Sequence, residues 1–160
     1  MMTVEQGWLD GTDSGRFVLC PEGAVAGWTG EGALEAAEAY AAGYAVPGHG
    51  DVLVLGGEPL LVGWLAEERV FVRPLHFDCS EDVRPPVREA LRSGVWEDGP
   101  VLDLIAGRYL LTDVCYDGEA IVERGEYLTV ELPPGRYLVQ SLVTGPGPRA
   151  DFLLERLLPR

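Results

Sequence analysis

Three residues near the middle of the chain are of types that could do chemistry together. His76 and Asp78 stand two positions apart in a predicted strand, so their side chains should share one face, with Cys79 next to them. Such a group is either a metal site or a thiol nucleophile with its base. A metal site needs a further ligand, for which His49 and Asp51 are the candidates. No known ligand spacing appears, which favours a surface His and Asp beside a buried thiol.

A second set of candidates is acidic. Asp103, Asp113 and Asp117 stand near the ends of predicted strands, and paired carboxylates do general acid–base work in glycosidases. The chain has 26 acidic residues among 160, however, so acids that meet by chance are expected. Motifs of the GxSxG, HExxH and GxGxxG types are absent, as is lysine. The sequence therefore predicts a protein that is not an enzyme and uses no cofactor or metal. A small metal- or thiol-dependent hydrolase centred on His76, Asp78 and Cys79 is the alternative.

The net charge of the chain limits the classes of molecule that it can bind. Twelve basic residues, all arginine, face 26 acidic ones, which gives a net charge of −14 at pH 7. Nucleic acid and anionic membranes repel such a chain, whereas a basic protein attracts it. No apolar run approaches the roughly 18 residues of a membrane helix. The first ten residues lack the features of a secretory signal, and we expect a cytoplasmic location. The three cysteines show no disulfide spacing and are expected as buried free thiols.

The length of the chain predicts one domain over residues 1–160. Residues 50–65 contain an apolar run, the sequence Gly56-Gly57-Glu58-Pro59 and a second apolar run, which predicts a hairpin of two buried strands. Hairpins are also predicted around residues 10–15 and at Asp117-Gly118. Further strands are expected at residues 70–77, 101–105, 108–115, 127–132, 136–143 and 151–158.

Two helices complete the predicted fold. Residues 31–43 are rich in alanine and carry an apolar stripe that starts at Leu34, with Gly43 as a C-cap. Residues 82–93 begin with two prolines in the first turn and end before Gly94. The predicted class is α+β, with a mainly antiparallel sheet that forms a sandwich or an open barrel. A β-rich module that binds a small ligand or acts as a scaffold in a complex remains a third interpretation, and a deep apolar pocket would favour it.

Contacts with a protein partner are predicted from charge and from tryptophan. Acidic runs are usually solvated, but in an acidic binding protein they are the first candidates for a complementary interface. Most of the four tryptophans are expected in the core, and one or two as interface anchors. The predicted contact residues are Glu58, Glu67, Glu68, Asp78, Glu81, Asp82 and Trp64.

Several stretches together resemble a known family. An apolar strand runs through residues 51–55 into Gly56-Gly57-Glu58-Pro59-Leu60, and a strand with Trp64 follows. The next strand ends in Val72-Arg73, where the family often continues with an aromatic residue and this chain has Pro74. In these features, and in residues 21–44, 108–113 and 132–137, the chain resembles the immunity protein 21 family of bacterial polymorphic toxin systems.

The resemblance implies a function. Members of this family neutralise toxins and are not enzymes, so it implies no catalytic residues. It implies a non-catalytic protein that binds a cognate toxin domain. The charge of −14 adds the expectation that this toxin domain is basic.

Overall fold

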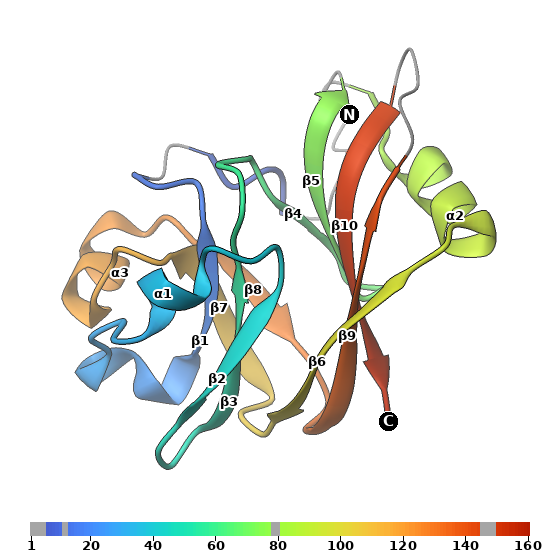
Figure 1. Ribbon diagram of the computed structural model, residues 1–160. Coiled ribbons are helices and arrows are strands. Elements are labelled where there is room, and N and C mark those ends of the chain that lie inside the picture. The colour runs from blue at the N-terminus through green and yellow to red at the C-terminus, as the bar shows by residue number, and fades with distance from the viewer. Residues whose placement is uncertain (1–5, 11–12, 78–80, 145–149) are drawn as a thin grey trace.

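The computed structural model describes residues 6–10, 13–77, 81–144 and 150–160. Its centre is one 10-stranded antiparallel sheet in the order β4-β5-β10-β9-β6-β3-β1-β7-β8, with β2 paired to β3. The sheet curves until it is nearly closed, like a barrel (Figure 1). The strands are β1 (Phe17–Pro21), β2 (Ala42–Val46), β3 (Gly50–Leu55), β4 (Gly63–Leu65), β5 (Val70–Phe77), β6 (Glu97–Leu104), β7 (Arg108–Asp113), β8 (Leu128–Glu131), β9 (Gly135–Val143) and β10 (Ala150–Pro159). The predicted α+β fold with a mainly antiparallel, barrel-like sheet is confirmed.

The helices form two separate layers outside the sheet (Figure 1). A 3-10 helix, η1 (Glu22–Gly27), lies with the short α1 (Ala33–Ala36) and α3 (Gly118–Arg124) beside β1 and β7. The longer α2 (Arg84–Ser93) lies beside β5 and β10 on the other half of the sheet. No helix in the described parts of the chain is long and apolar enough to cross a membrane.

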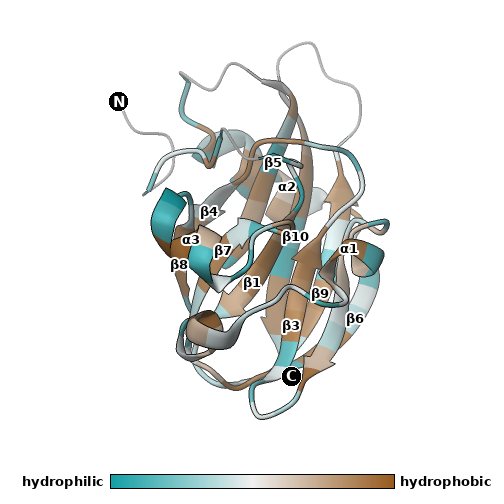
Figure 2. Cartoon of the chain, turned by 90° about the vertical axis from the view of Figure 1, so that its left-hand side faces the viewer, coloured by the Kyte–Doolittle hydropathy of each residue, from teal (hydrophilic) through white to brown (hydrophobic). Residues whose placement is uncertain are grey.

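Alternation along the strands produces three cores, because successive side chains point to opposite faces of a sheet. In β1, Phe17 and Leu19 belong to the inner core, whereas Val18 and Cys20 face the α1–η1–α3 layer. A third cluster lies between α2 and strands β4, β5 and β10. Figure 2 shows that strands β1 and β3 are largely apolar, whereas α3 carries several polar residues.

The sheet has a weak point between its halves. Strands β3 and β6 pair only at Gly50 and Leu104, and beyond that pair the two halves diverge (Figure 1). The N-terminal segment links the outer edges: Leu9 pairs with Val62, just before β4. The Gln6 amide donates to the carbonyl of Thr129 in β8 at 2.6 Å and accepts from its N–H at 2.8 Å. Strand pairing is therefore not the only interaction that holds the halves together.

The predicted helix over residues 31–43 is largely wrong. Only Ala33–Ala36 are α-helical, and Ala42–Val46 form β2, where Gly43 pairs with Leu53. The carbonyl that would continue the helix is used elsewhere, since Ala37 O accepts from the N–H of Gly57 at 2.8 Å. Gly43 is not a C-cap. It lies so close to Leu102 that a β-carbon would stand 2.2 Å from a methyl group.

Three predicted hairpins are also wrong. Strands β3 and β4 do not pair: β3 pairs with β1, β2 and β6, and β4 with β5. Leu9 pairs with Val62 and not with β1, whose two edges are occupied by β3 and β7. At the Asp-Gly signal, Asp117 accepts from the N–H of Ala120 at 2.9 Å and so caps α3.

The other elements agree with the sequence pattern. The helix predicted at 82–93 is α2, with its prolines in the first turn. Strand β5 covers the predicted residues 70–77. A register shift lies opposite Pro74, as a proline inside a strand predicts. The predicted strands at 127–132, 136–143 and 151–158 are β8, β9 and β10.

Candidate functional site

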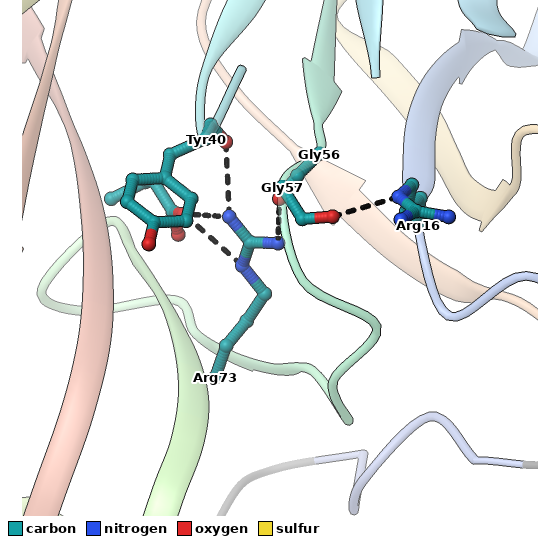
Figure 3. Close-up of polar contacts among 6 residues, drawn as sticks. Arg16, Tyr40, Gly56, Gly57 and Arg73 are labelled. Carbon is teal, nitrogen blue, oxygen red and sulfur yellow. Dashed lines mark hydrogen bonds and ion pairs between the residues drawn. The ribbon is translucent and has the colours of Figure 1, made fainter. Parts of the chain in front are cut away.

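A buried arginine spans the gap between the two halves of the sheet. Arg73 on β5 is fully buried and donates from Nη1 to the carbonyl of Gly56 at 2.6 Å (Figure 3). Its Nη2 donates to the carbonyl of Tyr40 at 2.9 Å. Its Nε donates to Oε1 of Glu155 at 3.1 Å, and Nη2 also contacts that oxygen. Arg73 therefore ties strands β5 and β10 to the loops before β2 and after β3, and we call this network the Arg73 clamp.

The strand register explains the buried pair. In the β5–β10 ladder, Arg73 lies opposite Leu153 and Glu155 lies opposite Phe71, so the two charged residues are diagonal neighbours. Both side chains are fully buried. Burial raises the pKa of Glu155 to about 7, and the nearby Arg73 opposes that rise. Glu155 Oε2 has no hydrogen-bond partner among the described residues, which also disfavours the charged form.

The clamp fixes a double-glycine loop. The N–H groups of Gly56 and Gly57 donate to the carbonyls of Tyr40 and Ala37 at 3.2 and 2.8 Å. Arg16 on the other side donates from Nε to the Gly57 carbonyl at 2.8 Å (Figure 3). A β-carbon on Gly56 would stand 2.1 Å from the Ala37 carbonyl oxygen, so the close approach requires glycine. The loop and the turn after α1 therefore form one hydrogen-bonded unit.

A surface groove of about 550 Å³ lies over this unit. Leu34, Glu38 and Tyr40 line it from the α1 side, and Glu58 lines it from the double-glycine loop. Leu34 and Tyr40 are 62% and 43% exposed, although both are large and apolar in character. We call this surface the α1 groove. It combines apolar side chains with acids above a floor that buried hydrogen bonds hold in place.

The surface charge differs between the two helical layers. Residues 22–38, which include η1 and α1, contain four acids and no arginine: Glu22, Glu31, Glu35 and Glu38. Residues 81–93, which include α2, contain three acids and three arginines. Arg84, Arg88 and Arg92 each pair with an acid there. Among the described residues, no arginine lies within ion-pair distance of the groove acids Glu38 and Glu58.

The predicted contact residues fall in several places. Glu58 is exposed at the α1 groove. Glu67 and Glu68 both contact Arg88 of α2, at 3.9 and 3.0 Å. The structure thus separates Glu58 from the acids near α2. Whether any of them touches a partner stays a prediction.

The remaining predicted contact residues lie near α2, in the core or outside the described residues. Glu81 is exposed just before α2, and Asp82 accepts from the N–H of Arg84 at 3.0 Å. Trp64 is buried, with its ring centroid 4.5 Å from that of Phe71, so its visible role is in the core. Asp78 lies outside the described residues.

The candidate catalytic acids have structural partners. Asp113 is fully buried and accepts from Ser14 N at 2.7 Å, Ser14 Oγ at 2.9 Å and Cys115 N at 2.8 Å. Asp103 lies 3.4 Å from Nε of Arg136, and Asp117 caps α3. These contacts account for all three carboxylates without an acid–base role.

The metal or thiol site of the alternative hypothesis falls on residues that the structure does not describe. Asp78, Cys79 and the side chain of His76 lie outside the described residues. Within the described residues, no group of three or more His, Cys, Asp or Glu side chains is placed to hold a metal ion. Asp51, one of the candidate additional ligands, accepts from the N–H of Asp103 at 2.8 Å.

The described cysteines are both free. Cys20 is buried as predicted, and burial raises the pKa of its thiol to about 12. Cys115 is exposed, which corrects the prediction of a buried thiol. Its pKa is raised by partial burial and by the nearby Asp113 carboxylate. Neither thiol is therefore activated as a nucleophile, because the thiolate is the reactive form.

Comparison with known proteins identifies the family. The family model described as Immunity protein 21 matches residues 8–150. The chain belongs to the immunity protein 21 family. No curated protein and no solved structure matches the chain.

In this immunity protein 21 chain, the residues of the family resemblance meet at the site. Gly56-Gly57-Glu58-Pro59 is the loop fixed by the clamp, and Val72-Arg73 supplies the clamp itself. The sequence alone does not show that Arg73 and Glu155 form a pair. The available signal was a charged residue at an inward position of each apolar strand, where one strand reads Phe71-Val72-Arg73 and the other Leu154-Glu155-Arg156-Leu157.

Proposed function

We propose that this member of the immunity protein 21 family acts by binding a cognate bacterial toxin domain and blocking its active site or substrate surface, without catalysis. The observation that carries the proposal is the family match over residues 8–150. It is supported by the structural partners of Asp103, Asp113 and Asp117 and by the raised thiol pKa values of Cys20 and Cys115.

The proposed toxin domain is basic. A net charge of −14 accelerates the encounter with a positively charged surface and makes the association rate sensitive to salt. Within residues 22–38, Glu22 pairs with Arg108 at 2.8 Å, whereas Glu31, Glu35 and Glu38 form no ion pair among the described residues, so their charge is available to a partner. We further propose that the protein acts in the cytoplasm of the cell that makes it.

The test is co-expression with the toxin encoded beside the gene. We expect cells that produce both proteins to survive, cells that produce the toxin alone to die, and the two proteins to co-purify as a complex. We also expect the association rate to fall at least about tenfold between low and high salt. Continued killing by the toxin, with no complex in a pull-down, would contradict the proposal.

A further inference from the structure

The α1 groove has a rigid floor. Arg73 and Arg16 bind three backbone carbonyls beneath it, those of Gly56, Tyr40 and Gly57. The Tyr40 ring lies against Gly57, where a β-carbon would stand 2.3 Å from a ring carbon. Fixed aromatic side chains make good interface anchors, because little conformational entropy is lost when a partner binds them.

The charges at the groove define the chemistry of a partner. Glu38 and Glu58 line it and are exposed, and no arginine of the described chain pairs with them. Arg16 also lines the groove, but its Nε is directed at the Gly57 carbonyl (Figure 3). The two carboxylates therefore outnumber the one cation at the groove, and a basic side chain is the complementary ligand.

The apolar part of the groove fits the same ligand. Lysine and arginine carry long apolar stems below their charged ends and bury these stems against apolar surface. Leu34 and Tyr40 offer such a surface, and the ring of Tyr40 also attracts a cation placed over its face.

We propose that the α1 groove receives a lysine or arginine side chain of the toxin domain, with its stem on Leu34 and Tyr40 and its charge between Glu38 and Glu58. This inference rests on the proposed function and specifies its docking surface. It predicts that the groove, and not the acids near α2, determines how long the complex lasts.

A second groove on the α2 side does not select a partner in the same way. It has a volume of about 420 Å³ and lies between α2 and β9, near Val95 and Val143, which are 87% and 50% exposed. Its acid, Glu89, is already paired with Arg92. This surface has apolar area but no unbalanced charge, so nothing there specifies an occupant.

The experiment compares two double variants with equal change in charge. Glu38→Arg/Glu58→Arg reverses the acids of the α1 groove, and Glu67→Arg/Glu81→Arg reverses two acids near α2. All four positions are exposed, so both variants should fold, which circular dichroism and thermal melting check. Binding of the full chain to an inactivated form of the toxin encoded beside the gene is measured by surface plasmon resonance.

We expect the groove variant to dissociate at least about tenfold faster than the wild type. The α2-side variant should keep a dissociation rate within about threefold of the wild type, although both variants lose association rate through their altered net charge. Leu34→Ala, which removes an exposed side chain and leaves the charge unchanged, should also weaken binding about tenfold.

Each other outcome has a distinct meaning. Equal dissociation rates for the two double variants, or a greater effect of the α2-side variant, would overturn the groove proposal and leave the proposed function standing. If the wild type does not bind the toxin at all, the proposed function itself fails. If the wild type is a dimer in light scattering and Leu34→Ala is a monomer, a second copy of the chain occupies the groove and the proposal is wrong.

Discussion

The two helical layers of this protein are stabilised in different ways. The α2 layer is one regular helix of ten residues that packs Val87 and Ala90 on the sheet and pairs its own arginines with acids. The α1–η1–α3 layer consists of short pieces joined by tertiary hydrogen bonds, such as that from Gly118 N to Trp28 O at 2.8 Å. The first layer neutralises its own charge locally. The second layer is held by these backbone hydrogen bonds and by the Arg73 clamp beneath it. The acids of the α1 groove, Glu38 and Glu58, form no ion pair among the described residues and are therefore available to a partner.

The same contrast applies to the ion pairs. The Arg73–Glu155 pair is completely buried and joins distant parts of the chain, whereas the Arg92–Glu89 pair is exposed within one helix. Removing one partner of a buried ion pair strongly destabilises a protein, because the other charged group stays buried without a partner. An exposed ion pair contributes little to the free energy of unfolding. Three substitutions, described from the largest expected effect to the smallest, test how far this difference holds.

Arg73→Met should have the largest effect. It leaves the Glu155 carboxyl group and the Gly56 carbonyl without their buried donor and removes one of the two donors to the Tyr40 carbonyl. We expect the free energy of unfolding to fall by about 3–5 kcal/mol, measured by urea denaturation. The matched control, Arg92→Met, removes an exposed pair and should change it by less than about 1 kcal/mol.

Amide hydrogen exchange then shows which parts of the protein lose stability in Arg73→Met. The amides of Gly56 and Gly57 should lose protection in Arg73→Met, while those of α2 keep theirs, because Arg73 hydrogen-bonds to the backbone of the loops beside the α1 groove and not to that of α2. Uniform loss of protection over both layers would contradict the view that the clamp supports only one of them.

Glu155→Gln should alter the dependence of stability on pH. Burial raises the pKa of Glu155 from its ordinary value of about 4.5 to about 7, so the folded state holds this proton more tightly than the unfolded state does. Its contribution to stability is therefore complete below about pH 4.5 and is lost as the pH rises through 7. The free energy of unfolding of the wild type should fall relative to that of the variant by about 1–3 kcal/mol over this interval.

The measurement is urea denaturation of both proteins at several pH values between 4.5 and 8. Taking the difference between the two proteins removes the contribution of the other acids. Parallel curves would show that Glu155 is ionised in the folded protein at every pH tested.

Asp117→Ala should have the smallest effect. It removes the side chain that accepts from Ala120 N at the start of α3, and the loss of such a cap costs about 1 kcal/mol. Glu123→Ala on the exposed side of α3 is the control and should stay within about 0.5 kcal/mol of the wild type. An equal loss in both variants, measured by thermal melting, would show that the cap does not stabilise α3.

The local sequence pattern was sufficient to predict an element where residues close in sequence make the contacts that stabilise it. The helix α2 has a start signal, an apolar stripe and a stop signal in sequence, and it was predicted within two residues at its start. Strand β5 begins with the apolar run Val70-Phe71-Val72 and was also predicted at its true bounds. For such elements, the side chains that decide the structure are close in sequence.

Prediction from the sequence failed where a residue that is distant in the sequence hydrogen-bonds to the backbone of the predicted element. Residues 31–43 have helical periodicity, but Gly57, Gly56 and Arg73 take the carbonyls of Ala37 and Tyr40. Gly56-Gly57 has the composition of a hairpin turn, yet its N–H groups bond to the turn after α1. At Asp117-Gly118, a β-carbon on Gly118 would stand 1.7 Å from the carbonyl oxygen of Val25, a constraint that no local pattern reveals.

The sequence by itself determined the acidic charge, the β-rich class, most strand positions and the resemblance to a family of immunity proteins. These depend on composition, on alternation and on motifs that are contiguous in the chain. Only the tertiary structure decided that Arg73 meets Glu155, which is 82 positions away in the sequence, and that Glu38 and Glu58 share one groove. The physical reason is that strand register and loop closure create the buried pair and the groove. Both bring together residues that are far apart in the sequence, and no local sequence pattern shows that these residues are neighbours.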